Sequence, residues 1–164
     1  MPYRAICVRR VKVKAISCDG FRPTPIPDRF FVVAELRHSS TNELVGVIDF
    51  LLDTGADRTT ISVDDAERLG IYDLPLIGGC PPQARGIGGD TPLRYLQPVV
   101  LLFHSPEEQE PASWSAKNLA VLSPTPAQRQ AGAFRGCFSL LGRDFLEHCH
   151  LDISKEEIRL HLNG

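Results

Sequence analysis

The chain has 164 residues, 43% of them hydrophobic, and a formal net charge of −2 at pH 7. This length fits one domain with a sizeable core. The small net charge gives no overall field that favours nucleic acid or an anionic membrane surface, and no apolar run approaches the length of a membrane span. The first ten residues contain no apolar signal-peptide stretch. We therefore expect a soluble, cytoplasmic protein that binds neither nucleic acid nor membrane.

Glycine and proline divide the chain into short apolar segments, which is typical of a mainly β protein. The sequence has 13 of each. Residues 1–29 are predicted to form an N-terminal extension, with a strand at 5–16 and a proline-rich linker, and residues 30–164 to form one domain. Within that domain, strands are expected at 30–36, 44–52, 93–103 with a break at Pro98, 118–122 and 138–141, and a hairpin at 151–162.

Two short helices and two loops complete the predicted domain. The helices are expected at 62–69, where Ser62 suits the N-cap and Gly70 the exit, and at 143–148. Loops are expected at 104–116 and 124–136, and residues 78–90 are rich in glycine and proline. The segment 44–52 is almost entirely apolar, so we expect that strand to be buried on both faces.

Cysteine and histidine usage predicts no metal site. The chain has five cysteines and no Cys-x-x-Cys pair, so the sequence contains neither a zinc ribbon nor a thioredoxin-type motif. We interpret the cysteines as reduced thiols. His148, Cys149 and His150 are consecutive, and adjacent side chains on one element point in different directions. We interpret them as the end of a helix, where histidine is favoured.

The most informative segment is Leu51-Leu52-Asp53-Thr54-Gly55-Ala56-Asp57. Here an apolar strand ends in a carboxylate, which is costly unless it is paired or hydrogen-bonded. Gly55 permits a tight turn in which backbone N–H groups face that carboxylate. The tripeptide alone is a weak signal, because Asp-x-Gly suits many ordinary turns.

Two further segments strengthen this signal. Arg85-Gly86-Ile87-Gly88-Gly89 has neither the phosphate-loop nor the dinucleotide pattern, and it suits the tip of a hairpin with accessible N–H groups. In Leu140-Leu141-Gly142-Arg143-Asp144, an apolar strand enters a helix through glycine. Arg143 at that junction is suited to a bidentate pair with a carboxylate such as Asp57.

In this order, the three segments resemble the retropepsins, the single-domain aspartic proteases related to retroviral proteases, over residues 30–162. The resemblance implies an all-β fold with two short helices, closed as an acid-protease barrel with one lobe per chain. It also implies an aspartic endopeptidase that needs no cofactor. The implied catalytic residues are Asp53, Thr54 and Gly55. The implied substrate-binding residues are Asp57, Arg58, Gly86, Ile87 and Gly88, and the implied structural supports are Ala56, Gly142 and Arg143.

The chain has one Asp-Thr-Gly and no Asp-Ser-Gly. An aspartic protease needs two carboxylates that share a proton, so the resemblance implies a symmetric homodimer with the site on its two-fold axis. The large cation Arg58 favours substrates with acidic side chains. Two alternatives stay open: a catalytically silent module that binds extended peptides by strand addition, and a dimerisation or scaffold domain.

Overall fold

The computed structural model describes residues 4–6, 8–11, 29–78, 83–86, 89–105, 110–153 and 158–162. The strands are β1 Arg4–Ile6, β2 Val8–Val11, β3 Arg29–His38, β4 Leu44–Leu52, β5 Thr60–Ile61, β6 Leu76–Ile77, β7 Gln83–Gly86, β8 Gly89–Leu96, β9 Val99–Phe103, β10 Ala112–Ala116, β11 Leu119–Leu122, β12 Ser139–Leu141, β13 Cys149–Ile153 and β14 Ile158–Leu162. The helices are α1 Val63–Arg68, α2 Pro126–Gln130 and α3 Arg143–Leu146, with a 3₁₀ helix, η1, at Ile71–Asp73.

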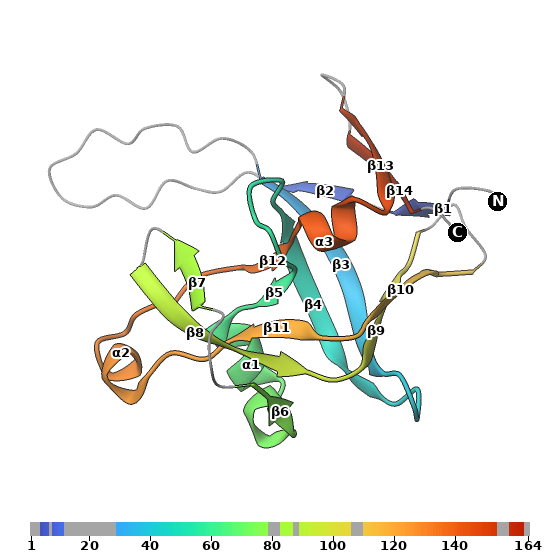
Figure 1. Cartoon of the computed structure of the whole chain (residues 1–164). Helices are drawn as coiled ribbons and strands as arrows, with labels where there is room; N and C mark the ends of the chain where they lie inside the picture. The colour runs from blue at the N-terminus through green and yellow to red at the C-terminus, as the bar shows by residue number, and fades with distance from the viewer. Residues whose placement is uncertain are drawn as a thin grey trace, which may run out of the picture.

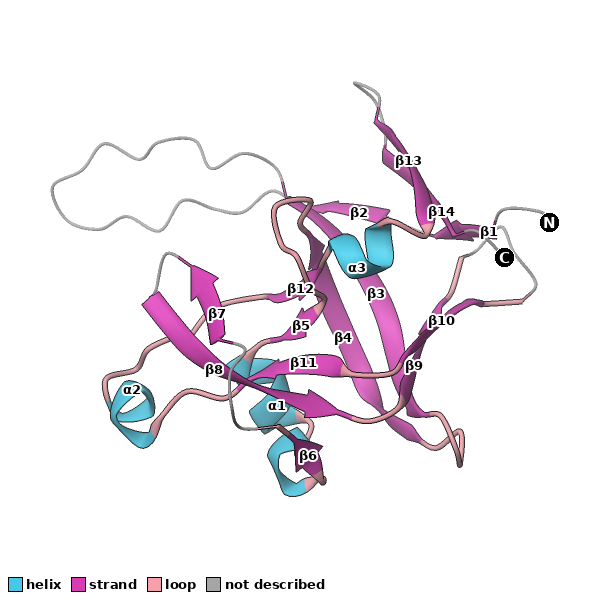
Figure 2. Cartoon of the chain, in the orientation of Figure 1, coloured by secondary structure: helices cyan, strands magenta, loops and turns pink. Residues whose placement is uncertain are grey.

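The strands form one large curled sheet and one small sheet (Figures 1 and 2). The large sheet has the order β10-β9-β3-β4-β12-β5-β11-β8-β6, with β2 added on β3 and β7 on β8, and the small sheet has the order β1-β14-β13. The predicted mainly β class with short helices is confirmed. Among the described residues no pairing joins β10 to β6, so the curled sheet is a half-barrel, more open than the closed barrel expected.

Strands β1 and β2 bring the N-terminal segment into both sheets. Strand β1 pairs antiparallel with β14, and β2 pairs antiparallel with β3. The expected strand at 5–16 is therefore two short strands, and residues 12–28 lie outside the described part of the chain. The boundary at residue 29 stays a prediction.

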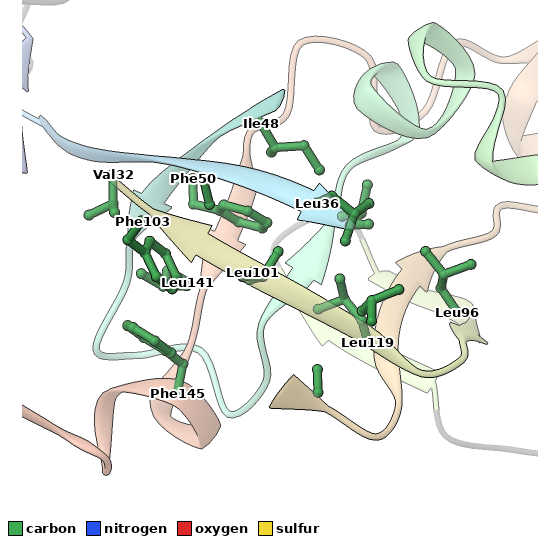
Figure 3. Close-up of a cluster of buried hydrophobic side chains, with 14 of the residues drawn as sticks. Val32, Leu36, Ile48, Phe50, Leu96, Leu101, Phe103, Leu119, Leu141 and Phe145 are labelled. Carbon is green, nitrogen blue, oxygen red and sulfur yellow. The ribbon is translucent and has the colours of Figure 1, made fainter. Parts of the chain in front are cut away.

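The core lies on the concave side of β3, β4 and β9 (Figure 3). Alternate residues of β3 and β9 are buried, among them Leu36 and Leu101. The prediction that β4 is buried on both faces is wrong. Ile48 and Phe50 are fully buried, but Val47 on the opposite face is 43% exposed. Strand β4 therefore has one core face and one partly open face, like most antiparallel sheet strands.

Two expected loops contain regular structure. Strand β10 occupies the end of the segment 104–116, and its burial alternates because Ala112 and Ala116 point inward. Trp114 of this strand is partly buried and packs edge-on against Phe145 of α3, with 5.3 Å between ring centroids. The segment 124–136 contains α2, so the described chain has three short α-helices where two were expected.

Candidate active site

The loop 53–59 begins where two parallel strands end. Strands β4 and β12 pair in parallel, with Leu52 opposite Leu141. The Asp53 N–H then donates to the Leu141 carbonyl at 3.1 Å, which extends the ladder by one residue. The core packing of β4 and β12 thereby fixes the backbone position of Asp53.

The carboxylate of Asp53 is held by its own turn. The Gly55 N–H donates to Asp53 Oδ1 at 2.9 Å, and the Ala56 N–H donates to the Asp53 carbonyl at 3.2 Å. A Cβ atom added at Gly55 would lie 3.2 Å from Asp53 Oδ1, which is tight for a carbon–oxygen contact. Asp53 itself is half-buried, and Thr54 and Gly55 are exposed. The predicted approach of a backbone N–H to this carboxylate is observed.

Arg143 and Asp57 form the predicted ion pair. The guanidinium Nη2 of Arg143 donates to Asp57 Oδ1, and the Arg143 backbone N–H donates to the Ala56 carbonyl at 2.8 Å. The two side chains are 64% and 78% exposed. An exposed pair adds little to the free energy of unfolding, so its main effect is to orient the first turn of α3 against the loop.

Gly142 is required because backbone approaches backbone at this position. A Cβ atom there would lie 2.4 Å from the Arg58 carbonyl carbon and 2.8 Å from the Thr59 nitrogen. The Gly142 N–H donates to Thr59 Oγ1 at 3.1 Å. No residue with a side chain fits this crossing of the loop over the start of α3, so the predicted supporting role of Gly142 has a direct steric cause.

Thr59 and Asp144 complete the support, and sequence reasoning assigned neither a role. Asp144 Oδ1 accepts from the Thr59 N–H at 2.7 Å, from the Thr59 hydroxyl at 2.8 Å and from the Phe145 N–H at 2.9 Å. Thr59 is 1% exposed. These two residues are 85 positions apart, so no local pattern reports the contact. The available signal was Thr59 itself, since a polar residue that is buried needs a hydrogen-bond partner.

Arg58 points its side chain toward the hairpin strand β8. Its guanidinium carbon lies 6.0 Å from the centroid of the Tyr95 ring, at the outer limit of a cation–π contact. Arg58 is exposed. Among the described residues it takes part in no ion pair.

The glycine-rich segment forms a hairpin, as predicted. Strands β7 and β8 pair antiparallel with Gly86 opposite Gly89, so the connection between them is two residues long. Those residues, Ile87 and Gly88, lie outside the described part of the chain, as does the proposed substrate contact of Ile87. We call the segment 83–96 the β7–β8 hairpin.

The part of the chain that the structure describes contains no group of three metal-ligating side chains. Cys149 is instead packed beneath α3, where its thiol donates to the Phe145 carbonyl at 3.7 Å. Burial raises the pKa of this thiol to about 12, which disfavours the thiolate that would bind a metal. An open surface hollow lies at the other end of β4, lined in part by His38, Leu44 and Leu69, and it is separate from Asp53.

The described structure is mainly β, with the Asp53 turn after the paired parallel strands β4 and β12 and with a glycine-rich hairpin, β7–β8. Residues 39–99 match the family described as aspartyl protease. The matched segment contains both Asp53 and the β7–β8 hairpin, and it agrees with the resemblance found in the sequence.

Among solved structures, the chain is similar to a retropepsin-like aspartic protease from Rickettsia conorii. The two are 19% identical, the alignment covers 99% of this chain and 96% of the other, and the TM-score is 0.45. The comparison with curated proteins gave no match. Among the described residues, none of the helices has both the length and the apolar character needed to span a membrane.

Proposed function

We propose that this protein is an aspartic endopeptidase whose active site is built from Asp53 of two identical chains. The observation that supports it most is the Asp53 turn. The Gly55 N–H holds Oδ1 at 2.9 Å, and among the described residues no hydrogen bond reaches Oδ2. A carboxylate oriented in this way presents one oxygen to a water or to a second carboxylate.

The chemistry follows from two carboxylates that share one proton, because neighbouring like charges do not both ionise. The ionised Asp53 takes a proton from a water molecule, and the water oxygen attacks the peptide carbonyl carbon. The protonated Asp53 of the second chain donates its proton to the carbonyl oxygen. The tetrahedral intermediate then collapses: the first Asp53 gives its proton to the nitrogen, the second takes one from a hydroxyl of the intermediate, the C–N bond breaks, and a carboxylic acid and an amine leave.

The other site residues bind and position in this proposal. Thr54 holds the two loops together across the two-fold axis, and Asp57, kept in place by Arg143, accepts hydrogen bonds from the substrate main chain. Gly86, Ile87 and Gly88 close over the peptide. Arg58 favours an acidic side chain of the substrate, since its guanidinium is exposed beside the loop.

The decisive variant is Asp53→Asn, with Asp49→Asn as its matched control. Asp49 is an exposed carboxylate on β4, the strand that leads into Asp53, four residues earlier. Cleavage of a peptide library between pH 4 and 7.5, followed by mass spectrometry, is expected to fall roughly 10²–10⁴-fold in the Asp53 variant and to stay unchanged in the control. Equal cleavage by all three proteins, or none by the wild type, contradicts the proposal.

Mixing tests whether two chains share the site. Equal amounts of wild type and Asp53→Asn, allowed to exchange subunits, form one quarter wild-type dimers, so the wild-type activity falls to about half. A site within one chain predicts no change on mixing. In the same library, Arg58→Gln is expected to lose a preference of up to about fivefold for acidic side chains, the size of an exposed charge pair.

A further inference from the structure

The segment between β11 and β12 lies along the first half of β8 (Figure 1). The ladder between β11 and β8 ends where Leu122 pairs with Leu93. Beyond it the contact continues in single hydrogen bonds. The Ser123 N–H donates to the Pro92 carbonyl at 2.9 Å, and the Gln128 side-chain amide donates to the Asp90 carbonyl at 3.1 Å. The contacts thus reach the residue next to Gly89, where the β7–β8 hairpin turns.

Gln128 uses both ends of its side-chain amide. Its Oε1 accepts from the Thr125 N–H at 2.9 Å, and its backbone N–H donates to Thr125 Oγ1 at 3.3 Å. This is a complete capping box at the start of α2. Its Nε2 is left for the Asp90 carbonyl. The side chain that caps α2 is therefore also the one that ties α2 to the hairpin.

The far end of this segment is anchored to α1. Arg135 Nη1 contacts Asp64 Oδ1 at 3.0 Å and Glu67 Oε2 at 2.8 Å, and the Gly136 N–H donates to Asp64 Oδ2 at 2.7 Å. Helix α1 is in turn joined to the main sheet, because Ser139 of β12 donates to Asp65 at 2.6 Å. The segment 123–136 is thus bound to the sheet side at one end and to the hairpin at the other.

We infer that the segment 123–136 is a brace for the β7–β8 hairpin and that Gln128 is a positioning residue within it. When the Gln128–Asp90 contact is made, the start of β8 is held against α2. When it is broken, the hairpin opens more often. The consequence for substrate rests on the proposed function, because a hairpin that opens more often covers bound peptide less of the time.

The substitution Gln128→Glu isolates this contact. A glutamate retains the oxygen that accepts from Thr125 and suits a capping box, and its negative charge is favourable in the first turn of a helix. It loses the donor to the Asp90 carbonyl. Gln130→Glu is the matched control, since Gln130 is exposed on the same helix and undergoes the same chemical change.

Hydrogen–deuterium exchange of the purified full chain provides the test. In Gln128→Glu, amide exchange in peptides from 83–96 is expected to rise about two- to tenfold, the effect of losing one exposed hydrogen bond. Exchange in peptides from 125–131 stays at the wild-type level, and Gln130→Glu matches the wild type throughout. Unchanged exchange in 83–96 overturns the inference. Equal rises in 83–96 and 125–131 also overturn it, because the helix has then melted and no specific tether was released.

A kinetic measurement separates positioning from general stability. On a cleaved peptide, Gln128→Glu is expected to raise KM about two- to tenfold with a smaller change in kcat, because only the covering of bound substrate is affected. A fall in kcat with KM unchanged contradicts this role. If exchange rises as expected but no variant cleaves any peptide, the brace stands and the proposed protease activity fails.

Discussion

The loop 53–59 and the β7–β8 hairpin contain the two groups of proposed site residues, yet they are held in different ways. The loop is fixed by backbone crossing, by the buried Thr59 and by Asp144, through contacts between segments 85 residues apart. The hairpin is tied to the segment 123–136 by a backbone hydrogen bond between the half-buried Ser123 and Pro92 and by the exposed hydrogen bond of Gln128, and exposed ion pairs anchor that segment. The loop is therefore held by close packing, and the position of the hairpin depends in part on contacts that solvent weakens.

The largest effect on stability is expected from Gly142→Ala. The added methyl carbon would lie 2.4 Å from the Arg58 carbonyl carbon, so the loop or α3 has to move. We expect the free energy of unfolding to fall by about 3 kcal/mol, the upper part of the range for overpacking. Urea unfolding measures it. Gly132→Ala is the control: it has a left-handed φ of 68° and no atom near its Cβ position, so only about 1 kcal/mol is expected. Equal losses of stability in the two variants would contradict the steric explanation for Gly142.

Asp144→Ala comes second. It removes the acceptor of three hydrogen bonds and leaves the buried Thr59 N–H without its partner. A loss of about 2 kcal/mol is expected, again by urea unfolding. Asp144→Asn, which keeps an oxygen in place, should lose less. If the alanine variant is as stable as the wild type, the loop is not held by this carboxylate.

Arg135→Gln tests the solvent-exposed side. Its ion pairs with Asp64 and Glu67 hold a guanidinium that is 54% exposed, so only a small loss of stability is expected at low salt. At 1 M salt the difference between variant and wild type should disappear, because exposed charges are then screened. A loss that is independent of salt would mean that Arg135 acts by packing.

The smallest expected effect concerns Cys149, and it is measured as the extent of alkylation of its thiol. Burial raises the pKa of its thiol to about 12, so at pH 8 only roughly 10⁻⁴ of it is thiolate. Peptide mass spectrometry after brief iodoacetamide treatment should find the exposed Cys137 alkylated and Cys149 intact. Comparable labelling of both would show that α3 opens readily.

The same pKa shift fixes the sign of a pH dependence. Because the folded pKa is above the unfolded value, the neutral thiol contributes stability that is fully present below about pH 9. That contribution is lost as the pH rises toward 12. Burial also raises the pKa of Tyr72, which acts in the same direction. Urea unfolding at pH 8 and pH 10.5 should therefore find lower stability at the higher pH, and Cys149→Ser should reduce the difference.

The sequence predicted those features whose signals are local. The cap at Ser62, the Asp53 turn and the break at Pro98 all appear where short-range patterns placed them. The ion pair of Arg143 with Asp57 was also predicted, because arginine suits a pair with a carboxylate and because both segments resemble those of the retropepsins. The β7–β8 hairpin was predicted from its glycines.

The missed features have either weak or distant signals. Strand β10 was missed because its inward residues are alanines, which have little strand preference. Helix α2 was missed although Thr125 and Gln128 form a capping box, because the helix that follows the cap has only five residues. The contact of Thr59 with Asp144 has no local pattern at all. It depends on the tertiary fold, which brings α3 beneath the loop.

The pairing of β1 with β14 has a consequence for whatever is joined to this domain. Arg4 lies opposite Leu162 in neighbouring antiparallel strands, so the first and last described residues lie side by side in β1 and β14 (Figure 1). A fusion partner placed before Arg4 and one placed after Leu162 would therefore be attached at nearly one point. Fluorophores attached at the two ends should give efficient energy transfer, and a short linker is enough to join the ends into a circular permutant.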